Sequence, residues 1–318
     1  MKGSYKISVS NAKIRYEFTI RRNITIIKGD SATGKTTLVE MIREFYENGT
    51  ASGIALQCER PCRVLGGRDW KVLLDSMQES IVFIDEDNEF LPTDAFAEMI
   101  RESGNYYVIV TREGLPNLPY SVDEIYGIRE AGRYASLKQT YNELYHIFGR
   151  EDYTRPVKPE HIVTEDSNAG YEFFKGIKGG ENHVETAGGK SNIAEMILNA
   201  DEGTLVIADG AAFGSEMDRA VKLLKQKAGV TLYLPESFEW LILRSGLITY
   251  HELRKVLEDP SDYIDSKEYF SWERYFNALL MEATKDSYLQ YSKRKLNSVY
   301  LQKEVYEKIL AIMKGIEL

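Results

Sequence analysis

The chain has 318 residues, a formal net charge of −9, 43% hydrophobic residues and 28% charged residues. This length exceeds one ordinary domain of about 150 residues, so two domains are expected. The acidic balance argues against a protein coated by nucleic acid, and no apolar run approaches the roughly 20 residues that a membrane helix requires. No secretory hydrophobic segment opens the sequence, so we expect a cytoplasmic protein without a membrane partner.

Two strand patterns begin the chain and a phosphate-binding loop follows them. Residues 5–10 and 14–20 read as amphipathic strands joined by a short hairpin turn. Ile24–Ile27 is a short apolar strand, and the residues from Gly29 to Thr36 fit the pattern G-x-x-x-x-G-K-[ST]. A helical pattern comes next, which completes the strand, loop and helix order that the motif requires.

Each residue type in this loop has a role in binding phosphate. The glycines let backbone N–H groups turn toward the phosphates, Lys35 reaches the β and γ oxygens, and the Thr36 hydroxyl can ligate Mg²⁺. The helix N-terminus attracts the same anion. Since the loop contacts only phosphates, the expected ligand is ATP or GTP with Mg²⁺. The predicted nucleotide-binding residues are Gly29, Asp30, Ser31, Ala32, Thr33, Gly34, Lys35, Thr36 and Thr37.

The two cysteines, Cys58 and Cys62, form a C-x3-C pair. The four scattered histidines provide no second half of a zinc site. We therefore expect two free thiols.

A second apolar strand, Ile81–Ile84, ends in two acidic residues. We assign Asp85 to the metal and Glu86 to orienting or deprotonating the attacking water. The alternative is an acidic turn after a core strand. A third strand, YYVIV, is followed by two polar residues that either sense a γ-phosphate or only cap the strand end, Thr111 and Arg112.

These elements describe a P-loop NTPase, and the strand pair before the loop resembles the start of ABC-type, AAA-like and SMC-like ATPases. No LSGGQ-like signature is present, and Leu65-Gly66-Gly67 is a poor substitute. The resemblance therefore covers the nucleotide loop and the strand order, but not the composite dimeric site. It makes a homo-oligomer a fair expectation, since ABC-type sites close between subunits.

The pattern loosens between the two halves. Leu137, Tyr141, Leu144 and Tyr145 lie on one face of a predicted helix, and two prolines then mark a linker. We divide the chain into a P-loop NTPase domain at residues 1–130, a helix and linker at 131–159, a second α/β domain at 160–243 and a C-terminal helical region at 244–318.

The second half alternates strands and helices, which predicts a small parallel sheet with helices on both faces. Functional groups should lie at the carboxyl ends of its strands, which carry Glu165, Lys190 and Asp209. We assign Glu165 as general acid or base and Asp209 as a Mg²⁺ ligand, with Lys190 beside them for phosphate. The alternative is a parallel α/β module whose acids are merely solvated. The elements expected, in order, are HIVTED, AGYEFFKGI, NHVETAGG, SNIAEMIL, TLVIADG, SEMDRAVKLLKQ and VTLYLPE.

The order of Glu165, the GGKSN segment and Asp209 resembles the TOPRIM domain of topoisomerases, primases and OLD-family nucleases, and GGKSN is most similar to the OLD-like version. The resemblance covers residues 160–242. It implies a metal-dependent phosphodiester site. The segment LPESFEWL resembles a strand and glutamate in TOPRIM-like proteins fused or paired with ABC-type ATPases in phage defence, which would add Glu239 to the site.

One departure from the TOPRIM pattern affects the expected metal site. TOPRIM domains normally carry D-x-D, whereas this chain has Asp209-Gly210-Ala211. Either Glu216 or Asp218, early in the following helix, replaces the missing carboxylate, or the metal site is weakened.

Beyond residue 243 the sequence predicts amphipathic helices at HELRKVLED, SWERYFNALLMEATKDSYLQYSKRK and LQKEVYEKILAIMK. Lys293, Arg294 and Lys295, with Tyr288 and Tyr291 nearby, could contact a DNA or RNA backbone. More often such a cluster is the solvated face of a helix.

Two functional hypotheses follow. In the first, ATP hydrolysis controls a metal-dependent nuclease built around Glu165 and Asp209, which would suit defence against phages or mobile elements. In the second, the chain is a nucleotide switch whose degenerate TOPRIM-like half recognises a partner without cleaving it. A P-loop kinase with its acceptor site in the second half is a third, less favoured option.

Overall fold

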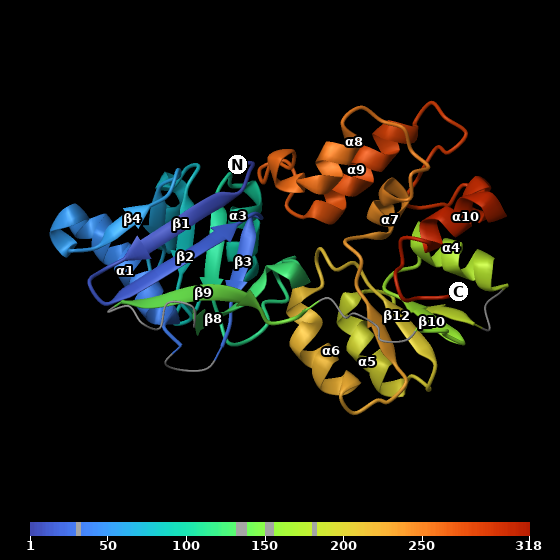
Figure 1. Ribbon diagram of the computed structural model, residues 1–318, viewed down its shortest axis with the longest axis horizontal. Helices are drawn as coiled ribbons and strands as arrows, with labels where there is room; N and C mark the ends of the chain where they lie inside the picture. Colours follow the sequence, from blue (N-terminus) through green and yellow to red (C-terminus); the bar gives the residue numbers. More distant parts are fainter. Residues whose placement is uncertain (30–32, 132–138, 150–155, 180–182) are drawn as a thin grey trace. The chain divides into compact units, whose positions relative to one another are not determined.

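The computed structural model describes residues 1–29, 33–131, 139–149, 156–179 and 183–318 as an α/β protein with two sheets. The chain divides into two compact units, coloured along the sequence in Figure 1. The first unit contains Met1–Gly149 and Asp259–Phe270. The second contains Arg150–Glu258 and Ser271–Leu318.

The first unit is built on a mixed sheet with the strand order β4-β1-β2-β9-β8-β3-β7-β6-β5. Strands β8, β3, β7, β6 and β5 run parallel, whereas β1 pairs antiparallel with β2 and β4. The strands are β1 Tyr5–Ser10, β2 Ile14–Ile20, β3 Ile24–Ile27, β4 Ala55–Gln57, β5 Cys62–Val64, β6 Ile81–Ile84, β7 Tyr106–Val110, β8 Ile125–Glu130 and β9 Thr140–His146.

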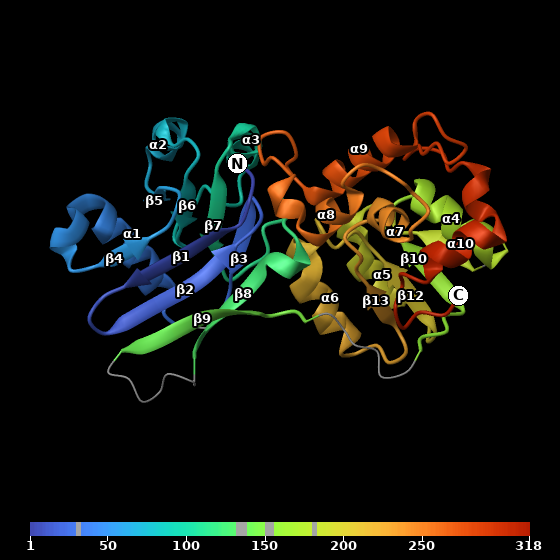
Figure 2. The same ribbon diagram turned by 45° about the horizontal axis from the view of Figure 1, so that its top comes forward.

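This sheet curls around helix α1, Lys35–Asn48. Its two edge strands, β4 and β5, are joined directly by residues 58–61, so the two edges approach each other. Buried side chains of β1, β2, β6, β7 and α1 share one hydrophobic core, with β1 and β2 in front of β6 and β7 in Figure 2. The core therefore holds α1 against the sheet. The other helices of this unit are α2 Trp70–Ser76 and α3 Asp94–Glu102.

The helix predicted over residues 137–145 is wrong where the structure describes it, because Thr140–His146 is strand β9. Leu137 lies outside the described residues. Strand β9 fits between β8 and β2, and Leu144 lies opposite Ile128. Pairing with two neighbours, together with the strand preference of Thr and Tyr, outweighs the local helical spacing. Part of the segment expected to be a helix before the linker thus contributes a strand to the first unit.

The second unit contains a four-stranded parallel sheet in the order β11-β10-β12-β13, as the alternating pattern predicted. In Figure 1, α5 and α6 cover one face and α4 lies on the other. The elements are β10 His161–Thr164, α4 Ala169–Lys178, β11 Val184–Thr186, α5 Ile193–Asn199, β12 Thr204–Ile207, α6 Met217–Leu224 and β13 Thr231–Tyr233.

The helices that follow β13 share one hydrophobic core with Ile162, Leu205 and Ile207 of the sheet. They are α7 Phe238–Arg244, α8 Leu253–Glu258, α9 Trp272–Thr284 and α10 Lys303–Leu310. Residues 259–270, by contrast, belong to the first unit.

The long helix expected to reach residue 295 ends at Thr284. The buried Thr284 hydroxyl donates to the Leu280 carbonyl at 2.7 Å and accepts the Tyr291 backbone N–H at 3.0 Å. The chain therefore folds back after α9, and the basic cluster at residues 293–295 is not on a helix.

Candidate functional site

The phosphate-loop motif lies between β3 and α1, as its sequence requires. Gly29 (φ 141°) and Gly34 (φ 88°) both have left-handed backbone that favours glycine. The Tyr16 hydroxyl donates to the Gly34 carbonyl at 2.9 Å, and a Cβ added at Gly34 would lie 2.6 Å from that hydroxyl oxygen. The end of the loop is thus fixed by contact with β2. Three predicted loop residues lie outside the described part of the chain, Asp30, Ser31 and Ala32.

Lys35 folds back over the loop. Its buried Nζ donates to the Gly29 carbonyl at 2.7 Å and to the Thr33 hydroxyl at 3.1 Å. Thr36 is exposed and Thr37 is half-buried on the first turn of α1. Gly34 is the N-cap of this helix, no side-chain cap is formed among the described residues, and the first turn contains no acid. The N–H groups and positive end of a 14-residue helix are therefore available to an anion.

Four further predicted residues come to the same edge of the sheet, because β3, β6 and β7 are parallel and end there. Glu86 and Arg112 form an ion pair, with N–O distances of 3.1, 3.0 and 2.7 Å. The Asp85 carboxylate accepts the Glu86 backbone N–H at 2.9 Å. The Thr111 hydroxyl donates to the Glu113 carbonyl at 3.0 Å. Arg112, which lies just after β7, thus contacts an acid that lies just after the neighbouring strand β6.

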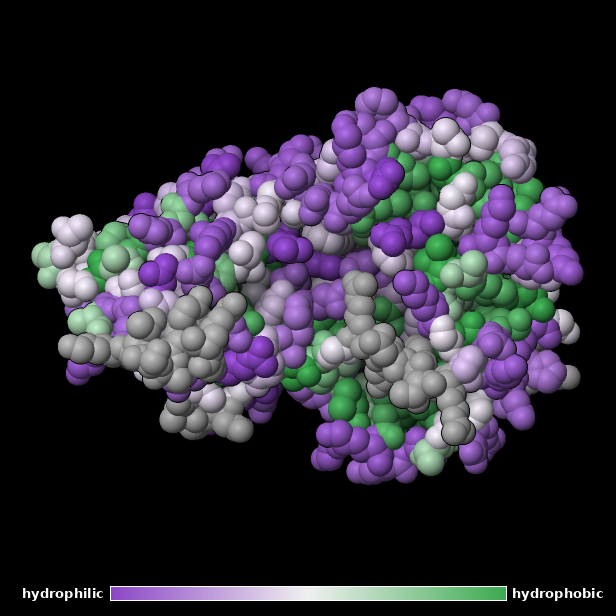
Figure 3. All heavy atoms as spheres, viewed as in Figure 1, coloured by the Kyte–Doolittle hydropathy of each residue, from purple (hydrophilic) through white to green (hydrophobic). Residues whose placement is uncertain are grey.

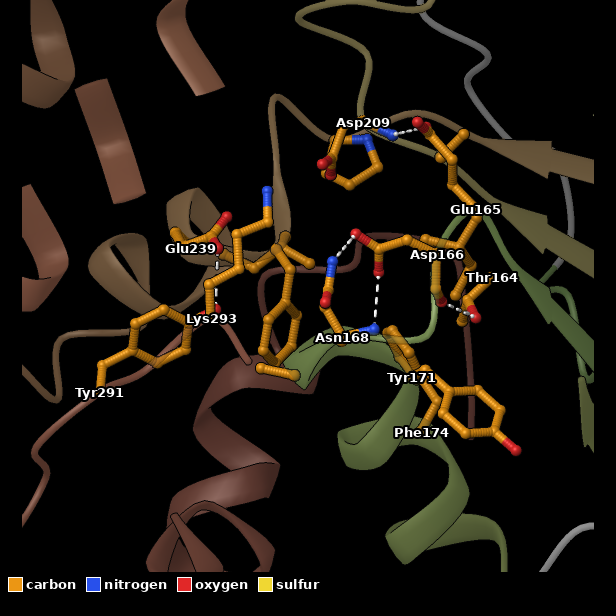
Figure 4. A pocket seen from close by; sticks show the side chains of 17 residues that line it. Thr164, Glu165, Asp166, Asn168, Tyr171, Phe174, Asp209, Glu239, Tyr291 and Lys293 are labelled. Atoms are coloured by element: carbon orange, nitrogen blue, oxygen red, sulfur yellow. Dashed lines mark hydrogen bonds between the residues drawn. The ribbon is translucent and has the colours of Figure 1, made fainter. Parts of the chain in front are cut away.

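A second candidate site is a pocket in the second unit at the carboxyl ends of β10, β12 and β13 (Figure 4). We call it the acid pocket. Phe174, Phe238 and Leu241 are among its apolar walls. Its polar lining includes Thr164, Glu165, Asp166, Asn168, Asp209, Glu239, Tyr291 and Lys293.

The two acids assigned to chemistry do meet in this pocket. One carboxylate oxygen of Glu165 accepts the Asp209 backbone N–H at 3.1 Å. Burial raises the pKa of Glu165 to about 7, despite this hydrogen bond. Burial also raises the pKa of Asp209 well above its ordinary value, and Glu273, Glu165 and Glu239 add repulsion. Both groups therefore resist carrying a negative charge without a cation beside them.

The strand expected within LPESFEWL is wrong, because the Ser237 side chain caps helix α7, which begins at Phe238. Glu239 lies in the first turn of this helix and is only 2% exposed. It accepts a hydrogen bond from the buried Tyr291 hydroxyl at 2.8 Å. Lys293 forms an ion pair with Glu273 of α9. Burial opposes the charge of Lys293, but Glu273, Glu239 and Asp209 outweigh it and raise its pKa.

Sequence reasoning missed part of this arrangement. Nothing in the local pattern assigned Glu273 to a site, and Lys293 and Tyr291 were interpreted only as parts of a cluster that could contact nucleic acid. The Lys293 side chain belongs to the pocket lining, whereas Arg294 and Lys295 are exposed. The fold-back after Thr284 is what turns Lys293 inward, and no sequence signal revealed it.

The predicted substitutes for the D-x-D carboxylate are not among the residues that line the acid pocket. The Glu216 carboxylate accepts the Ser215 hydroxyl at 3.1 Å, and Asp218 is exposed on α6. Lys190 donates to the Ala212 carbonyl at 3.1 Å, and burial lowers its pKa. Across the described ranges no three Asp, Glu, His or Cys side chains lie close enough together to hold a metal ion. The donor set of the second unit therefore does not fit the expected Mg²⁺ ligation.

On the face drawn in Figure 3, hydrophilic residues cover most of the first unit, and hydrophobic residues gather in patches between elements of the second. None of the helices in the described part of the chain is both long and apolar enough to cross a bilayer. Comparison of the sequence with protein-family models and with curated proteins finds no match.

Proposed function

We propose that the first unit binds and hydrolyses a nucleoside triphosphate, ATP or GTP. The observation that carries the proposal is the junction of β3 and α1, where a buried lysine folds over a glycine-bounded loop and the helix begins without a side-chain cap or an acid. Such a junction offers backbone N–H groups, a helix dipole and an ammonium to the same phosphates.

Hydrolysis is assigned to the acidic strand end. Glu86 is the residue that would activate water, and Arg112 is the residue that would contact the γ-phosphate. Mg²⁺ fits the oxygen donors offered by the exposed Thr36 hydroxyl and by Asp85, which would hold it with the nucleotide. When bound, the ion neutralises charge that develops on the phosphates.

Nucleotide binding tests this proposal directly. We expect Lys35→Ala to abolish binding of fluorescent ATP and GTP analogues in an equilibrium titration with Mg²⁺. Lys13→Ala, which removes an exposed lysine of the same unit, is the matched control and should bind like wild type. Unchanged affinity in Lys35→Ala, with both variants folded, would show that the loop does not bind phosphate.

For the second unit we propose a recognition module that responds to nucleotide binding and does not itself cleave. Three acids in or beside its pocket are paired with protein groups: Glu165 with the Asp209 N–H, Glu239 with the Tyr291 hydroxyl, and Glu273 with Lys293. This pattern supports a preformed polar pocket more than a set of metal ligands.

Phosphodiester cleavage is the second candidate, because a carboxyl whose pKa is raised to about 7 is suited to general acid and base catalysis near neutrality. A cleavage assay on mixed DNA and RNA separates the two candidates. It compares wild type, Lys35→Ala and Glu165→Gln, with and without ATP and with Mg²⁺ or Mn²⁺. Cleavage that Glu165→Gln loses would support a nuclease, whereas nucleotide hydrolysis without any cleavage would support the recognition module.

A further inference from the structure

The acid pocket contains one cation of its own. Four carboxyl groups line it, from Glu165, Asp166, Asp209 and Glu239, and Lys293 enters among them from the segment that follows α9 (Figure 4). Glu273, on α9, forms an ion pair with the same ammonium. The lysine therefore comes from a different part of the chain than the acids at the ends of the strands.

Burying several carboxyl groups together is costly unless a cation or protons balance them. Lys293 supplies such a cation: its side chain is 30% exposed, that of Glu273 is 21% exposed, and Glu239 is almost fully buried. Asp209 and Glu239 also attract this ammonium, although Glu273 has the larger effect. The charge of one lysine therefore offsets that of three acids from three separate segments of the chain.

The carboxylate oxygens of the pocket are poorly arranged to bind a divalent ion. Mg²⁺ and Mn²⁺ require several oxygen ligands around one point. Instead, Glu165 is directed to the Asp209 N–H at 3.1 Å, and Glu239 is held by the Tyr291 hydroxyl at 2.8 Å. No set of three acids converges within the part of the chain that the structure describes.

We propose that Lys293 is the resident cation of the acid pocket and takes the place of a divalent metal there. The pocket keeps its shape and charge balance without a bound metal. A metal ion that approached Asp209 or Glu239 would be repelled by the nearby ammonium of Lys293. This inference concerns only the second unit and does not depend on nucleotide binding by the first.

Manganese binding tests it on the full chain without nucleotide, with Mn²⁺ alone as the probe and electron paramagnetic resonance to measure the free ion. We expect Lys293→Met to gain one Mn²⁺ site at least about tenfold tighter than any that wild type has in this pocket, because a unit positive charge no longer opposes the ion. Adding Asp209→Asn to Lys293→Met should remove that site. Lys295→Met, which removes an exposed lysine two residues away, should gain nothing.

A comparison without any lysine variant keeps the test valid if Lys293→Met does not fold. Wild type and Asp209→Asn should bind Mn²⁺ equally, since neither uses the pocket for metal. If Asp209→Asn loses a site that wild type has, the metal is the resident cation and the proposal is overturned. A folded Lys293→Met that gains no site overturns it as well.

Discussion

The guanidinium of Arg112 contacts both carboxylate oxygens of Glu86, with N–O distances of 3.1, 3.0 and 2.7 Å. The two residues are brought together because β6 and β7 are adjacent parallel strands that end at the same edge. Arg112 is 60% exposed and Glu86 is 21% exposed, so the pair lies open to the loop side of the sheet. Glu86, proposed to activate water, and Arg112, proposed to contact the γ-phosphate, therefore form an ion pair with each other.

This pairing leads to a prediction for Glu86→Gln. Loss of a general base lowers turnover by about 10²- to 10⁴-fold. Affinity for a non-hydrolysable ATP analogue should rise by about threefold, because the weakened pair releases Arg112 to the γ-phosphate. Affinity for ADP should stay the same. Steady-state phosphate release and analogue titration measure the two effects.

A double-mutant cycle with Arg112→Met tests the cause of the affinity change. In the Arg112→Met background, Glu86→Gln should leave affinity for the analogue unchanged. An equal gain in both backgrounds would mean that simple repulsion between Glu86 and the nucleotide is responsible.

Gly34 gives the second prediction. Gly34→Ala places an alanine at a φ of 88°, which strains its backbone. The added Cβ would also lie 2.6 Å from the Tyr16 hydroxyl oxygen. We expect a loss of about 1–3 kcal/mol in unfolding free energy, together with weaker nucleotide binding. Urea denaturation measures the first effect. Tyr16→Phe in the same chain removes the clashing oxygen and should recover part of the loss, the backbone strain accounting for the rest.

Glu165 gives a prediction about pH. Burial raises its pKa from the ordinary 4.5 to about 7 in the folded protein. Between these values the unfolded chain releases a proton that the folded chain retains, so this group lowers stability progressively as pH rises from about 4.5 to 7. Glu165→Gln removes this effect. It should raise the unfolding free energy above pH 7 by at most about 3 kcal/mol and change it little at pH 4.

Thermal unfolding at both pH values measures this difference. Glu185→Gln, which replaces an exposed glutamate of the same sheet, is the matched control and should show no pH-dependent gain. A gain for Glu165→Gln that is equal at pH 4 and pH 8 would rule out titration of this carboxyl as the cause.

Cys58 gives the fourth prediction. A side-chain hydrogen bond with Cys62 is the main cause that lowers the pKa of Cys58 to about 7, against the effect of burial. Iodoacetamide should therefore alkylate one thiol rapidly at pH 7, as read by intact-protein mass spectrometry. Cys62→Ala, which removes this hydrogen bond, should slow the reaction by about tenfold as the pKa returns toward its ordinary value. Cys58→Ser should leave only the slow modification of a 7% exposed Cys62.

Local patterns were enough to predict much of the fold. Every strand and helix expected between residues 161 and 236 is present, because short apolar runs form the buried central strands and a period of 3.6 follows from a helix that buries one face. The phosphate-loop motif was equally visible, since its glycines and lysine are consecutive and their roles depend on the local backbone. The α/β class and the parallel order of the second sheet followed from the same patterns.

Contacts between distant segments depended on the tertiary structure. Residues 140–146 form a strand because they fit between β8 and β2, which no local period encodes. Glu86 meets Arg112 only because β7 is the neighbour of β6. Lys293 is part of an acid pocket instead of a surface cluster because the chain folds back after Thr284. Strand pairing and charge pairing act through space, so the sequence determined which groups were available and the fold decided which of them meet.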